Sequence, residues 1–234
     1  MGKRALVIKY SDAWNKMTLM RTRDHQTYDL SWDTYGYFCS TPSMIADRDY
    51  CETDPSLLQI IPYIVLYKHL GDKLSLLTYV RGKGGTETRL HDKLSVGLGG
   101  HIEEMPNKPE GLDAVIYRAA VRELEEELGA SYVSDTLKES MANILLASRL
   151  NRDHTILGNP PTLYHSRATP VDEVHLGVFT LVPVTDENLS MDLEKGVIEG
   201  ASWKSFSELT NESTYARLET WSKAVVDNLT RVLF

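Results

Sequence analysis

The most informative segment of this chain is Arg122-Glu123-Leu124-Glu125-Glu126-Glu127-Leu128-Gly129-Ala130, which follows an upstream turn, Gly99-Gly100-His101-Ile102-Glu103. Apolar side chains recur through it at spacings of four and three residues: Tyr117, Val121, Leu124 and Leu128. This period predicts a helix from about Leu112 to Leu128 with one apolar stripe. Gly129 then stands where a helix end favours a left-handed residue.

Three carboxylates of this predicted helix, those of Glu123, Glu126 and Glu127, occupy positions i, i+3 and i+4 and face away from the stripe. Like charges at this spacing repel by a few tenths of a kcal/mol per pair, roughly. A divalent cation converts that repulsion into binding, and hard oxygen ligands suit Mg²⁺ or Mn²⁺. For three acids alone, however, a solvated helix face is the commoner explanation.

The pattern around these acids favours the metal site. Arg-Glu-aliphatic-any-Glu-Glu-any-Gly-aliphatic after a Gly-Gly turn resembles the second half of the Nudix box, and every specified position from Arg122 to Ala130 matches if Ala130 counts as the small apolar residue. Further segments resemble a MutT-like subgroup of predicted phosphoesterases with an extended box. They are Asp54-Pro55, Gln59–Tyr63, Arg89-Leu90-His91, Ser95–Ile102 and Val174-His175-Leu176-Gly177.

The resemblance implies an α/β fold, the Nudix α/β/α sandwich with a mixed central sheet. Residues 57–234 would form the Nudix domain and end in an amphipathic helix. Residues 1–56 would form an N-terminal extension, with a strand and an aromatic-rich segment, packed on that domain. The implied reaction is hydrolysis of the pyrophosphate linkage of a nucleoside diphosphate derivative, with Mg²⁺ or Mn²⁺ aligning a water for attack on phosphorus.

Roles for individual residues also come from the resemblance. Glu123, Glu126 and Glu127 correspond to the metal ligands, and the backbone carbonyl of Gly99 or Gly100 joins them. Arg122 corresponds to the arginine that braces a box glutamate.

The general base varies within the family, so Glu199 and Glu194 are its candidates, and a plain surface acid is an equal alternative for each. Glu126 or Glu127 could also activate the water.

Substrate contacts are expected from basic residues near the Gly-Gly turn. Arg81 and Arg89 flank a positively charged loop that leads into this turn, so they could reach a phosphate. His101 lies beside the turn. Its side chain is as much expected to contact the substrate as to have a structural role in the core. His175, on an apolar strand, reads as a hydrogen-bonded core histidine.

One departure from the family pattern concerns spacing. Gly100 and Arg122 are 22 positions apart where the family has 14, so eight extra residues intervene. Counting from either side reaches Pro106 or Ala114, and neither is the box acid. Glu103, Glu104 or Glu110 could substitute for it.

Composition excludes several functional classes. The net charge of −8 and the lack of a basic stripe argue against generic nucleic-acid binding. The small nucleotide-type substrate is implied by the resemblance alone. No apolar run approaches the roughly 20 residues of a membrane span, and the N-terminal apolar core is too short for a secretory signal. Cys39 and Cys51 are expected to be free thiols, so we predict that the protein is cytoplasmic.

The aromatic residues between Thr27 and Cys39 could stack a nucleobase, but they more often cover a sheet or a homodimer interface. Further strands are predicted at 5–10, 57–68, 73–81, 142–151, 174–182 and within 194–203. An irregular loop is predicted at 152–169, and helices from 205 and over 212–229.

Two other functions compete with the hydrolase. A Nudix-fold sensing or protein-binding module without turnover would be favoured by loss of box carboxylates, but these are present. A Nudix-type isomerase of isopentenyl diphosphate would need a cysteine near the active face of the sheet. Cys39 and Cys51 lie in the N-terminal extension, so this reading ranks last.

Overall fold

The structure is a computed structural model, which describes residues 2–14, 20–21, 27–29, 32–84, 90–106, 110–147, 160–184 and 198–233. The chain divides into two compact units. The first comprises Met1–Ile64, Gly99–Arg122 and Lys138–Thr180, and the second comprises Val65–Leu98, Glu123–Leu137 and Leu181–Phe234. Strands β5 (Leu57–Leu70) and β9 (His175–Pro183) and helix α4 (Leu112–Leu128) each contribute residues to both units.

In the first unit, strand β1 (Arg4–Lys9) joins β5 to β4 (Ser43–Asp47). Both pairings are antiparallel, with Leu6 opposite Ile45 and Ile8 opposite Leu58. The inner residues of β1, Ala5 to Ile8, are fully buried. The strand predicted at 5–10 is present as β1, and its pairing with β4 and β5 makes it an integral part of this sheet.

The rest of the first unit's sheet is built on β9. Gln59 N–H donates to the Val174 carbonyl, and the Tyr63 ring lies 4.9 Å from that of Phe179, so β5 and β9 run parallel. Strand β8 (Thr162–His165) pairs antiparallel with β9, β3 (Thr27–Asp29) with β8, and β2 (Met20–Arg21) with β3. The sheet is mixed, as the resemblance implies.

Short helices connect these strands: α1 (Tyr10–Trp14), α2 (Trp32–Cys39), α3 (Arg48–Cys51) and α7 (Pro170–Glu173). Asp47 caps α3 by accepting from Tyr50 N–H, and Thr169 caps α7 by accepting from Asp172 N–H. Within the aromatic segment, Tyr35 and Phe38 are fully buried and belong to the core, whereas Tyr37 is exposed.

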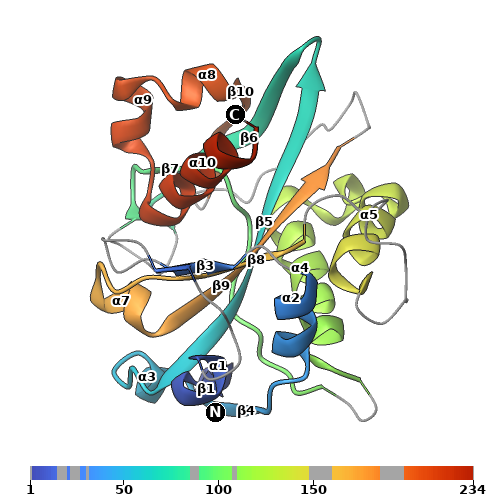
Figure 1. Ribbon diagram of the computed structural model, residues 1–234. Coiled ribbons are helices and arrows are strands. Elements are labelled where there is room, and N and C mark those ends of the chain that lie inside the picture. The colour runs from blue at the N-terminus through green and yellow to red at the C-terminus, as the bar shows by residue number, and fades with distance from the viewer. Residues whose placement is uncertain are drawn as a thin grey trace. The chain divides into compact units, whose positions relative to one another are not determined.

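The second unit centres on the β5–β6 hairpin shown in Figure 1. Strand β6 is Lys73–Arg81, as predicted, and Leu70 lies opposite Lys73 across the predicted Gly71-Asp72 turn. Gly71 has φ +61°, which favours glycine. Strands β10 (Ile198–Ser205) and β7 (Leu94–Ser95) pair antiparallel with β6.

The C-terminal segment corrects one prediction. The expected helix over 212–229 is divided into α9 (Glu212–Arg217) and α10 (Thr220–Leu233), after the short α8 (Phe206–Leu209). Leu218 forms a parallel bridge to Leu94, and Glu219 N–H donates to the Leu94 carbonyl. Pairing with β7 therefore interrupts a helical period that the sequence carries without a break.

Helix α4 confirms the predicted bounds, and Gly129 ends it with φ +91°. Beyond the 3₁₀ turn at Ala130–Tyr132, helix α5 (Asp135–Leu145) replaces the first part of the strand predicted at 142–151. Its buried residues Leu137, Met141, Ile144 and Leu145 recur at helical spacing. The strand prediction was wrong there because a short apolar run does not distinguish strand from buried helix.

The irregular loop predicted at 152–169 is also partly wrong. Its second half contains β8, which is buried and hydrogen-bonded to β9, while residues 152–159 lie outside the described residues. Cys39 and Cys51 are buried free thiols, as predicted. Within the described ranges, no helix is long and apolar enough to cross a bilayer. The domain boundary at residue 56 stays a prediction.

Candidate functional site

The three box carboxylates lie on α4 in different environments. Glu126 is exposed, Glu123 is half-buried, and Glu127 is 7% exposed. The apolar stripe needs correction: Leu124 and Leu128 are fully buried, but Tyr117 and Val121 are only half-buried. The buried face also includes Ile116, Ala119 and Ala120. It is wider than the predicted stripe, so Glu127 falls within it rather than on the side that faces solvent.

The environment of Glu127 includes Tyr79 on β6. Burial raises the pKa of the Tyr79 hydroxyl, and the Glu127 carboxylate adds to that rise. Tyr79 Oη–H donates to the Gly97 carbonyl at 2.7 Å. The single hydroxyl hydrogen of Ser95 has two acceptors within reach, the Glu219 carboxylate at 2.5 Å and the Gly97 carbonyl at 3.1 Å, and the shorter bond is to the carboxylate. Tyr79 is thus the main side-chain donor that holds the segment before the Gly-Gly turn.

Arg122 is tied to the turn upstream of the helix. Its Nη2 donates to the His101 carbonyl at 2.8 Å. Whether it also braces a box glutamate, as the resemblance implies, stays a prediction.

Gly99, the predicted backbone ligand, lies against the main chain of β5. It has φ +156°, and a Cβ added there would fall 1.9 Å from the Pro62 carbonyl oxygen. Only glycine allows this approach. The absence of a side chain therefore fixes the path of the turn, and the metal role of the Gly99 carbonyl stays a prediction.

The insertion between the turn and the helix is anchored to α4 by Arg118. Its Nε donates to Glu104 at 2.9 Å and its Nη1 to Glu110 at 3.1 Å. Two of the three candidate substitutes for the missing box acid are therefore engaged in ion pairs. Glu103 is exposed.

The other predicted residues are spread over β6 and β10. Arg81, half-buried, ends β6 opposite Ile198, and Glu199 is exposed and lies opposite Val80. Because side chains alternate along a strand, Arg81 and Glu199 fall on opposite faces of this strand pair. Arg89 and Glu194 lie outside the described residues.

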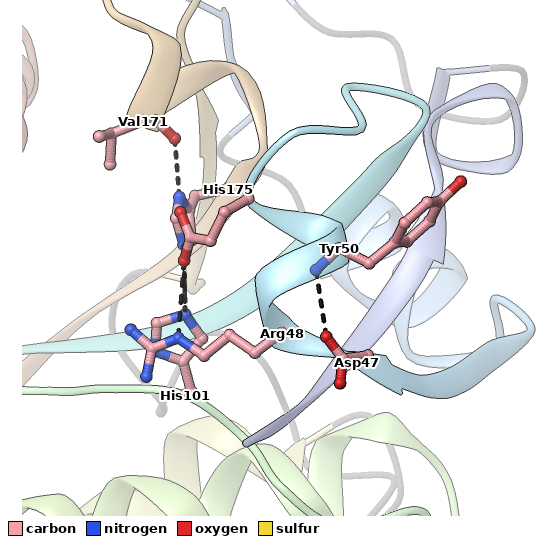
Figure 2. A network of polar contacts seen from close by, with 7 residues as sticks. Asp47, Arg48, Tyr50, His101, Val171 and His175 are labelled. Atoms are coloured by element: carbon pink, nitrogen blue, oxygen red, sulfur yellow. Dashed lines mark hydrogen bonds and ion pairs between the residues drawn. The ribbon is translucent and has the colours of Figure 1, made fainter. Parts of the chain in front are cut away.

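A second cluster, in the first unit, was not predicted as a site. Figure 2 shows His175 between the Val171 carbonyl and His101. The two Nε2 atoms are 3.3 Å apart, and Glu52 Oε1 lies 4.0 Å from each. Glu52, His101 and His175 therefore bring three ligand atoms within 4.8 Å of one another.

Both histidines of this cluster are neutral at physiological pH. Burial lowers the pKa of His101 to about 2, assisted by Arg48, His175, Lys3 and Arg122. Burial also lowers the pKa of His175, against the raising effects of the Val171 carbonyl and Glu52. Neutral imidazole is the form that binds metals.

Sequence reasoning missed Glu52 and the convergence of the cluster. The three residues come from the end of α3, the Gly-Gly turn and the start of β9, and no local spacing relates them. His175 is hydrogen-bonded and buried, as expected of a core histidine, but its Nε2 faces two further ligand atoms.

No family model matches this chain. The chain is 34% identical over 182 residues to YmaB of Bacillus subtilis (strain 168), which covers 78% of this chain and 76% of that protein. Among solved structures, Tm1382, a candidate Nudix hydrolase, has a TM-score of 0.62 and 22% identity, over 98% of this chain and 100% of Tm1382. A NUDIX hydrolase from Alicyclobacillus acidocaldarius gives a TM-score of 0.47 with 14% identity, over 73% and 90% of the two chains.

The similarity to Tm1382 confirms the predicted α/β fold, the Nudix sandwich with its mixed sheet. The narrower resemblance to one MutT-like subgroup stays a prediction.

Proposed function

This chain belongs to the same protein family as Bacillus subtilis YmaB and has the Nudix hydrolase fold, and we propose that it is a metal-dependent pyrophosphohydrolase. Its substrate is a nucleoside diphosphate derivative, cleaved by attack of water on phosphorus. The observation that carries this proposal is the intact second half of the box on α4, from Arg122 to Ala130.

The donor chemistry of the box fits Mg²⁺ or Mn²⁺. Glu123, Glu126 and Glu127 would supply carboxylate oxygens, the hard ligands that these cations prefer. The Gly99 carbonyl is the backbone ligand that the resemblance implies. When bound, the metal neutralises the diphosphate and makes a bound water easier to deprotonate.

The protein groups have separate roles in this reaction. Glu126 is exposed and would be the box carboxylate that a metal reaches first from solvent, while Glu127, at 7% exposure, would hold it from the buried side of α4. Arg122 fixes the turn that carries Gly99, by donating to the His101 carbonyl.

Charge and proton transfer involve residues elsewhere in the chain. Arg81 and Arg89 neutralise substrate phosphates. His101, next to the Gly-Gly turn, contacts the substrate. Glu199 lies on the opposite face of the β6–β10 pair from Arg81, so it accepts the proton of the attacking water only if the substrate binds on its own face. With the substrate on the Arg81 face, a box glutamate, Glu126 or Glu127, takes this role. The free thiols support a cytoplasmic location.

The proposal is tested by incubating the full chain with nucleoside diphosphate derivatives of different base, sugar and leaving group. The nucleoside monophosphate and the phosphorylated leaving group are separated and measured with Mg²⁺, with Mn²⁺ and after chelation. We expect turnover of at least one substrate with metal and its loss on chelation. Turnover that survives chelation would contradict the metal dependence. Tight binding of a nucleotide without turnover would favour the sensing module instead.

A further inference from the structure

Glu52, His101 and His175 form a triangle of ligand atoms whose size matches a metal ion. The three separations are 3.3, 4.0 and 4.0 Å, and they join Glu52 Oε1 and the two histidine Nε2 atoms. The circle through three points so spaced has a radius of about 2.2 Å, close to the roughly 2.0–2.2 Å of zinc–nitrogen and zinc–oxygen bonds. An ion at its centre would reach all three atoms with little movement.

The ring of His175 is oriented for this role. Its Nδ1–H donates to the Val171 carbonyl at 2.7 Å, so its Nε2 carries a lone pair directed at His101 and Glu52. Metal-binding histidines typically donate their other ring N–H to a carbonyl in this way. Val171 lies in α7, whose N-terminus is capped by Thr169.

The His101 ring needs only a change of tautomer. Its Nε2–H donates to His175 Nε2 in the absence of metal, and moving this proton to Nδ1 frees the Nε2 lone pair. The His175 side chain is 7% exposed and the His101 side chain 15%, whereas the Glu52 side chain is 33% exposed. Glu52 therefore gives the cluster an opening to solvent through which an ion can enter.

We infer that Glu52, His101 and His175 bind a late first-row divalent cation, of which Zn²⁺ is the representative. Two imidazoles and one carboxylate favour such a cation over Mg²⁺, which prefers oxygen ligands alone. Three protein ligands leave a coordination position for water or an anion. Glu52 and His175 lie outside the box in sequence, and His101 directly follows its Gly-Gly turn. The site uses none of the box carboxylates and does not rest on the proposed hydrolase activity.

The charges around the cluster set its affinity. Arg48 Nε lies 3.5 Å from Glu52 Oε1, the same oxygen that would bind the metal, and Figure 2 shows Arg48 beside His101. Lys3 and Arg122 are further cations near His101. Metal binding must therefore displace Arg48 from Glu52, and the surrounding positive charge favours an anion in the remaining coordination position.

The test measures Zn²⁺ binding to the full chain by competition with a chromophoric chelator, in excess Mg²⁺ to occupy sites made only of carboxylates. The variants are Glu52→Gln, His101→Gln and His175→Gln, and the control is His69→Gln, an exposed histidine of β5. We expect the wild type and the control to bind one Zn²⁺ ion tightly per chain. Each ligand variant should bind Zn²⁺ with an affinity lower by about 100-fold or more. Equal affinity of the wild type and all three variants would overturn the site.

Two further measurements keep the test decisive if a buried histidine variant unfolds. Co²⁺ bound to the wild type should give the absorption of nitrogen and oxygen coordination, and Glu52→Gln, at a part-exposed position, should remove it. Arg48→Gln should bind Zn²⁺ up to about fivefold more tightly, the scale of an exposed ion pair. Weaker binding in Arg48→Gln would contradict Glu52 as a ligand.

Discussion

Replacing Gly99 by alanine tests how the Gly-Gly turn is held against β5. The added Cβ would lie 1.9 Å from the Pro62 carbonyl oxygen, whereas Cβ contacts in proteins are essentially never under 3.0 Å, so the two chains must separate by about 1 Å. The neighbour is backbone and cannot rotate away. Overpacking costs about 1–3 kcal/mol and the φ of +156° adds strain, so we expect a loss of about 2–4 kcal/mol.

The measurement is equilibrium urea unfolding of the full chain, with Gly36→Ala as the control. Gly36 lies within α2, and a Cβ there meets nothing within 4 Å. Alanine should therefore stabilise that helix by about 0.5–1 kcal/mol. The two Gly→Ala substitutions should move the free energy of unfolding in opposite directions. A Gly99→Ala protein within about 0.5 kcal/mol of wild type would refute the close approach to Pro62.

Three further outcomes follow from buried groups. Burial lowers the pKa of His165, so the unfolded chain takes up more protons below its pKa of 6.5. The free energy of unfolding should then fall as pH drops below about 6.5, by up to about 1.4 kcal/mol per unit from this residue, and His165→Gln should lessen that slope in urea titrations. Tyr79→Phe should cost about 1–3 kcal/mol, because it removes the 2.7 Å donor of the buried Gly97 carbonyl while the Ser95 hydroxyl donates to Glu219; a loss under about 0.5 kcal/mol would contradict this. Cys51 is fully buried and burial raises its pKa, so the folded chain should leave this thiol unmodified by a thiol reagent that labels it in urea, as mass mapping can check.

The elements that the sequence predicted correctly are those with local causes. Helix α4 has its bounds because a long apolar period ends at Gly129, and the β5–β6 hairpin follows from Gly71-Asp72 between two apolar runs. Such signals depend on neighbours within a few residues, so one sequence suffices to find them.

The errors arose where distant pairing decides the outcome. Strand β8 exists because β9 pairs with it, and the C-terminal helix is broken because Leu218 bridges Leu94. The Glu52, His101 and His175 cluster has the same origin, since its members meet only when three separated segments pack together. The wide buried face of α4, which includes Glu127, likewise depends on what the helix packs against.

The most direct measurement compares two neighbouring glutamates on α4. Glu126 is a specified position of the box, whereas Glu125 is its variable position, and both substitutions to glutamine remove one charge from the same helical turn. Pyrophosphohydrolase rates are measured with Mg²⁺ on the best substrate of the panel. We expect Glu126→Gln to lose about 100-fold or more in kcat, the scale of a lost charge-stabilising contact, and Glu125→Gln to stay within about threefold of wild type. Equal rates for the two variants would contradict the assignment of the box as the metal site.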